Sequence, residues 1–116
     1  MGDRALVIFT DGKDVSPVIY LHWHGSSAPG LLMQHRQLMA SRGADLQYAA
    51  ARFVGIVHAT MPDQNLSLGM WNADVATREA VLGADAEALD RLSPGDAGVI
   101  VVDVARYEWE AFGGYL

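Results

Sequence analysis

Cysteine is absent from the 116-residue chain, and lysine occurs once, at Lys13, beside seven arginines. The lack of cysteine excludes a disulfide framework, thiol catalysis and every zinc site that uses thiolate ligands. No apolar run approaches the roughly 18 residues that cross a bilayer. The N-terminus shows no signal-peptide pattern. These absences predict a cytoplasmic protein with no membrane partner.

Basic character is also lacking, because the formal net charge is −6 at pH 7. A nucleic-acid-binding domain ordinarily shows a basic patch, so direct binding to nucleic acid is not expected. Apolar residues make up 51% of the chain, which is typical of a globular protein. The length predicts one domain spanning residues 1–116.

The hydrophobic pattern predicts an α+β fold, with an antiparallel sheet of about five strands and two main helices packed on one face. Asp45 is the expected N-cap of the second main helix, Gly43 ends the first, and Thr77 and Asp85 are expected to cap two shorter helices. The expected order is ββααβ(α)ββ. The predicted strands are 5–10, 18–24, 66–72, 98–103 and 107–115, the main helices are 28–41 and 46–60, and shorter helices are expected within 73–92.

The predicted strand 18–24 carries two of the four histidines. Alternation along a strand would place Ile19, Leu21 and Trp23 on the core face. The same alternation would place Tyr20, His22 and His24 together on the opposite face.

His22 and His24 stand two positions apart, with only Trp23 between them, a spacing that can place two imidazoles on one metal ion such as zinc. A catalytic centre would need a third ligand, and no H-E-x-x-H motif supplies one. The alternative is a polar strand face on which the two histidines bond to their neighbours. Residues that could complete a metal site, if the fold brings one of them close, are His35, His58, Asp103 and Glu110.

Other catalytic chemistry has little support. No serine lies in a G-x-S-x-G motif, and the serines are explained as turn, cap or strand residues. Glu108 and Glu110 share one strand face, where two carboxylates can act as acid and base. Such a pair more often marks an edge strand protected from aggregation by its charge. The protein is therefore expected to be non-enzymatic.

Aromatic side chains give the remaining signal. Tyrosine and tryptophan are enriched in binding hot spots, and an apolar sheet face is seldom left to solvent. The predicted binding surface is the sheet face away from the two main helices. The alternative is that residues 73–92 fold over this face and make it a second core. The residues expected on the surface are Tyr20, His22, His24, Trp71, Tyr107 and Trp109.

Four segments carry a resemblance to known proteins. They are D-G-K-D-V-S-P-V-I-Y-L-H-W-H-G at 11–25, Y-A-A-A-R-F-V at 48–54, N-L-S-L-G-M-W at 65–71 and G-D-A-G-V-I-V-V-D-V at 95–104. In these segments the chain resembles small uncharacterised proteins of bacteria and their phages or plasmids. The resemblance spans nearly the whole chain and brings no activity or site residue with it.

Three functions follow as hypotheses. The first is a protein-binding module, an anti-CRISPR-like inhibitor by which a phage or other mobile element blocks a host system, with no cofactor. The second is a small metal-dependent hydrolase or metal-binding protein that uses His22 and His24. The third is a homodimeric structural or accessory protein.

Overall fold

The computed structural model describes residues 2–60 and 68–116, and the fold is α+β, as the sequence predicts. In chain order the elements are β1 (Ala5–Thr10), β2 (Val18–Leu21), the 3-10 helix η1 (Gly25–Ser27), α1 (Ala28–Met39), α2 (Leu46–Thr60), β3 (Leu68–Trp71), α3 (Val75–Leu82), α4 (Ala86–Leu92), β4 (Gly98–Asp103) and β5 (Glu108–Phe112). The predicted turn at 62–65 and the first two residues of the predicted strand 66–72 lie outside the described residues.

The five strands form one sheet in the order β3-β2-β1-β4-β5. Strands β1 and β2 pair antiparallel across the turn that contains Asp11-Gly12, as predicted. The sheet is mixed rather than wholly antiparallel, because β1 and β4 run parallel at its centre. A parallel pair needs a long crossover connection, and α3 and α4 lie in the connection that leads from β3 across the sheet to β4.

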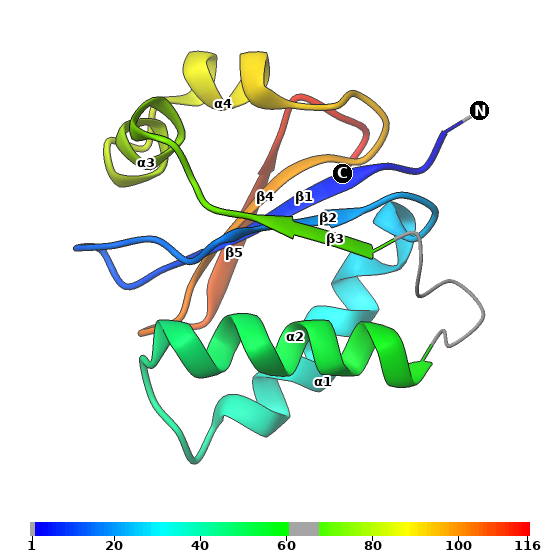
Figure 1. The fold of residues 1–116 in the computed structure, drawn as a ribbon, viewed down its shortest axis with the longest axis vertical. Coiled ribbons are helices and arrows are strands. Elements are labelled where there is room, and N and C mark those ends of the chain that lie inside the picture. The colour runs from blue at the N-terminus through cyan, green and yellow to red at the C-terminus, as the bar shows by residue number, and fades with distance from the viewer. Residues whose placement is uncertain (1, 61–67) are drawn as a thin grey trace.

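Helices cover both faces of the sheet (Figure 1). The two main helices, α1 and α2, lie together on one face, as predicted, and we call this the α1/α2 face. The shorter helices α3 and α4 lie on the other, the α3/α4 face. Residues 73–92 therefore do fold over the second face, which was the alternative to a bare sheet face.

The larger core lies on the α1/α2 face. The side chains of Val7, Phe9 and Ile19 point from the sheet towards α1 and α2, and Phe53 meets Phe9 with ring centroids 5.6 Å apart. All four are fully buried. Burying a side chain of this kind stabilises the fold by roughly 1.5–3 kcal/mol.

A second core lies on the α3/α4 face. Ile8, Val18 and Val99 point from the sheet, and Val81 of α3 and Leu89 of α4 cover them. Because neighbouring residues of β1 and β2 alternate between the two cores, both faces of these strands are apolar.

Helix caps explain where the helices begin. The carboxylate of Asp45 accepts from the amide of Tyr48 at 3.2 Å, and that of Asp85 from Ala88 at 3.2 Å, so both predicted caps are confirmed. The prediction for Thr77 is wrong, because α3 begins earlier and Asp74 is its cap. The Asp74 carboxylate accepts from the Thr77 amide at 2.8 Å.

The first main helix ends where a glycine permits it. Helix α1 stops at Met39, two residues before the predicted end, and Gly43 adopts a φ of 71° while its amide bonds back to the Met39 carbonyl at 3.2 Å. No helix within residues 2–60 and 68–116 is long and apolar enough to span a membrane.

Candidate interaction surface

Strand β2 ends three residues earlier than the sequence pattern predicts. His22, Trp23 and His24 follow Leu21 outside the strand, so strand alternation does not place them. The chain then passes so close to the N-terminal segment that a Cβ on Gly25 would lie 2.6 Å from the Asp3 carbonyl oxygen. The Gly25 amide donates to this oxygen at 2.7 Å. This contact turns the chain away from the sheet.

Trp23 was expected in the core, and that expectation is wrong. Its side chain is 50% exposed, whereas Ile19 and Leu21 are buried as predicted. Because Trp23 lies beyond the end of β2, its indole contacts the ring of His22 with centroids 4.4 Å apart, edge to face.

Four side chains form a contiguous cluster that we call the aromatic corner: Tyr20, His22, Trp23 and Trp71. Tyr20 and Trp71 come from the paired strands β2 and β3, and their ring centroids are 5.9 Å apart. Gly69 is the strand partner of Tyr20, and a Cβ there would lie 3.6 Å from the tyrosine side chain. The lack of a side chain at Gly69 therefore leaves the ring of Tyr20 uncovered on that side.

A hydrogen bond fixes two members of the aromatic corner against each other. The Tyr20 hydroxyl and His22 Nδ1 are 2.5 Å apart. When the hydroxyl donates to Nδ1, Nε2 carries the imidazole proton and remains the ring's hydrogen-bond donor. The cluster therefore combines aromatic area with a polar group held in place.

Helices α3 and α4 leave the aromatic corner uncovered. Trp71 is 49% exposed, and Tyr20 and His22 are partly exposed. Because the rings of the aromatic corner already pack against one another, their side chains lose little conformational freedom when a partner binds. Half-exposed tryptophans beside a tyrosine are a composition typical of binding hot spots.

His24 lies apart from this cluster. It precedes η1, and its Nε2 atom is buried without a hydrogen-bond partner among the described residues. Nearby, the Asp3 carboxylate accepts from the amide and hydroxyl of Ser26, at 2.8 and 2.6 Å, and from the hydroxyl of Tyr115. These bonds lower the pKa of Asp3 against the opposing effect of its partial burial. The arrangement ties the two chain ends to η1.

No three histidine, aspartate or glutamate side chains in residues 2–60 and 68–116 are grouped closely enough to hold a metal ion. His22 and His24 thus find no third ligand in this part of the chain. His58 is exposed in the last turn of α2, and His35 is buried in the larger core.

Tyr107 belongs to the opposite side of the sheet from the aromatic corner. Its hydroxyl lies 2.6 Å from His35 Nδ1 and 3.0 Å from the Leu32 carbonyl oxygen, while His35 Nε2 lies 2.8 Å from the Ala49 carbonyl oxygen. Burial raises the pKa of Tyr107 and lowers that of His35, so both are held neutral. This network joins α1, α2 and the β4–β5 turn.

Trp109 lies on the α1/α2 face as well. It lines a pocket of about 220 Å³ beside α1, together with Leu32, Met33 and Tyr107. The structure therefore brings Tyr20, His22 and Trp71 together, adds Trp23, and places His24, Tyr107 and Trp109 elsewhere.

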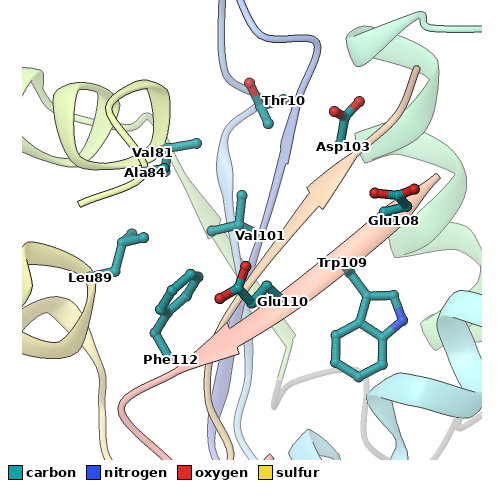
Figure 2. A pocket seen from close by; sticks show the side chains of 10 residues that line it. All are labelled: Thr10, Val81, Ala84, Leu89, Val101, Asp103, Glu108, Trp109, Glu110 and Phe112. Atoms are coloured by element: carbon teal, nitrogen blue, oxygen red, sulfur yellow. The ribbon is translucent and has the colours of Figure 1, made fainter. Parts of the chain in front are cut away.

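The predicted carboxylate pair borders a groove of about 300 Å³ on the α3/α4 face (Figure 2). Glu108 and Glu110 line it with Asp103, above an apolar floor that includes Val101 and Phe112. None of the ion pairs among the described residues involves these three carboxylates. They lie on or beside the edge strand β5, where charge discourages pairing with another sheet.

Comparison with known protein families, with curated proteins and with solved structures gave no match.

Proposed function

We propose that this protein is a non-enzymatic protein-binding module whose recognition surface is the aromatic corner. The observation that carries the proposal is the contact chain from Trp71 through Tyr20 and His22 to Trp23, with both tryptophans about half exposed. These residues come from two strands and the segment after β2, so the surface depends on the folded chain.

The energetics of aromatic side chains support this role. Each ring brings a large apolar area, and contacts between rings add about 0.5–1.5 kcal/mol beyond the area that is buried. A partner that covers both indoles would remove two large apolar groups from water. The hydrogen bond between Tyr20 and His22 gives that partner a polar group of fixed orientation.

The test starts from affinity capture with the whole protein, followed by identification and purification of the captured protein. Binding is then titrated by calorimetry with the variant that combines Trp23→Ala and Trp71→Ala. Hot-spot truncations cost 2 kcal/mol or more, so we expect the dissociation constant to rise at least about 30-fold.

Two control variants accompany this measurement. Met33→Ala removes a side chain that is 68% exposed on α1, and Trp109→Ala removes the indole on the α1/α2 face. Both should bind within about threefold of the wild type, and circular dichroism should show all variants folded. Unchanged affinity in the doubly substituted protein would contradict the proposal, and weakened binding by Trp109→Ala would favour the wider surface predicted from sequence.

The identity of the partner is a separate matter. That it belongs to a host system blocked by a mobile element, as an anti-CRISPR-like inhibitor would require, stays a prediction. Metal-dependent chemistry at His22 and His24 also stays a prediction, and elemental analysis of the purified protein tests it.

A further inference from the structure

We infer that two copies of this chain associate through the outer edge of β3, so that their sheets join into one. Among residues 2–60 and 68–116, the strands at the two edges of the sheet are β3 and β5. Strand β5 carries Glu108 and Glu110, whereas the four residues of β3 carry no charge. Natural sheets commonly protect their edges with charged side chains, and β3 lacks this protection.

The side chains of β3 point to the same conclusion. Met70 is 54% exposed on the α1/α2 face, and Trp71 is 49% exposed on the α3/α4 face. A partner lying on one face would cover one of these residues. A strand added beside β3 lies against both.

A second copy of β3 can pair with this edge in a symmetric register centred on Met70. In a symmetric antiparallel pair, one residue lies opposite the same residue of the other copy. The residue after it then lies opposite the residue before it, and residues that lie opposite each other share a face of the sheet. With Met70 opposite Met70, Trp71 of each copy lies opposite Gly69 of the other. Gly69 has no side chain, so there is room beside it for the indole of the other copy. The Tyr20 side chain of the same copy already lies against Gly69.

Charge also favours β3 over β5 as the edge where two copies meet. Each copy carries a net charge of −6. Joining through β3 places both β5 strands, with Glu108 and Glu110, at the two ends of the ten-stranded sheet. The acidic groove beside β5 is then far from the contact, which limits repulsion between the copies.

This inference goes beyond the proposed function, because it concerns the hydrogen-bonding edge of the sheet rather than the aromatic corner. The two share Trp71, so the experiment uses Met70, whose side chain lies on the opposite face from the aromatic corner. Loss of the dimer and loss of partner binding can then be observed separately.

The first experiment is sedimentation velocity of the whole protein between about 1 and 100 µM. We expect the wild type to sediment with twice the mass of one chain. Met70→Lys places two facing lysines at the contact, and we expect the dissociation constant to rise at least about 100-fold. Met33→Lys, which adds the same charge on α1, should leave the dimer intact. A monomeric wild type, or an unchanged dimer in Met70→Lys, would overturn the inference.

The second experiment uses the absence of cysteine. Met70→Cys introduces a single thiol into the chain. Facing residues in an antiparallel pair have Cα atoms about 4.5–5.5 Å apart, within the range that a disulfide bridges. Mild oxidation should therefore yield a covalent dimer on a non-reducing gel, whereas Met33→Cys should not crosslink. Equal crosslinking of the two variants would contradict the register, even if Met70→Lys failed to fold.

Discussion

His35 is an ionisable residue that is fully buried among the side chains of the larger core. Both ring nitrogens have partners, and its ring contacts Phe9 with centroids 4.9 Å apart. A neutral imidazole donates Nε2–H to the Ala49 carbonyl, and its Nδ1 shares the single hydroxyl proton of Tyr107 with the Leu32 carbonyl oxygen. Protonation would place a charge in the larger core.

Stability should therefore fall in mild acid. Burial lowers the pKa of His35 in the folded protein, while an unfolded histidine titrates near 6.5. As the pH falls, the unfolded chain takes up the proton first. The free energy of unfolding therefore keeps its full value above about pH 6.5 and decreases at lower pH. The steepest slope is about 1.4 kcal/mol per pH unit for one proton. Urea unfolding at several pH values between 8 and 5 measures the slope.

Two substitutions identify the residue responsible for this slope. His35→Gln should flatten the dependence in this range, and His58→Gln, at an exposed position, should leave it as in the wild type. The pKa values of three carboxylates are also lowered, those of Asp3, Asp14 and Asp96. Their protonation changes the free energy of unfolding in a more acidic range, below about pH 4. An unchanged slope in His35→Gln would show that another group takes up the proton.

For single residues, strand alternation predicts which side chains are buried only as far as the strand itself extends. Alternation placed Ile19 and Leu21 in the core, where the structure has them. It failed for Trp23, because a strand pattern does not show where the strand ends. The approach of Gly25 to Asp3 ends it, and that contact joins residues far apart in the sequence. The pairing of Tyr107 with His35 was hidden for the same reason.

Among the elements, α3 offers the clearest test of local stabilisation. Asp74→Ala removes the oxygen that accepts from the Thr77 amide and leaves the first turn of the helix uncapped. The Tm should fall by about 4 °C, as expected for the loss of an N-cap in a domain of this size. Thermal unfolding followed by circular dichroism measures it.

The matched variant is Asp74→Asn, because asparagine keeps a capping oxygen in the same place. It should unfold within about 1 °C of the wild type. If Asp74→Ala and Asp74→Asn lowered the Tm equally, the carboxylate charge rather than the cap would be responsible.

Element positions were largely predictable, and sheet pairing was less so. The Asp11-Gly12 turn, the cap at Asp45 and the β-branched run of β4 are local signals, and all three are confirmed. The parallel pairing of β1 with β4 has no local signal. It depends on the crossover through α3 and α4, whose apolar residues gave a weak pattern because both helices are short.

For the whole molecule, the two cores share one sheet and should unfold together. Ile19 of β2 belongs to the core on the α1/α2 face, and Ile8 of β1 belongs to the core on the α3/α4 face. Ile8→Val and Ile19→Val each remove one buried methylene, and each should lower the free energy of unfolding by about 0.5–1.5 kcal/mol. Urea titration measures both.

In both Ile8→Val and Ile19→Val, two spectroscopic probes should report the same unfolding transition. Tryptophan fluorescence and far-UV circular dichroism should give coincident transitions with an unchanged m-value. Val75→Ala, at a position that is 73% exposed, is the control and should change stability little. Separate transitions, with one core lost before the other, would contradict shared cooperativity.

The parallel pairing of β1 and β4 also bears on the order in which the chain folds. The Arg4 amide, just before β1, bonds to the carboxylate of Asp96, 92 residues away in the sequence. During synthesis, β1 must wait for its central neighbour until the residues of β4, Gly98–Asp103, have been made. Contacts between such distant residues slow folding, since a long loop must close before they form. The nascent β1–β2 hairpin therefore remains without its central partner strand until β4 arrives.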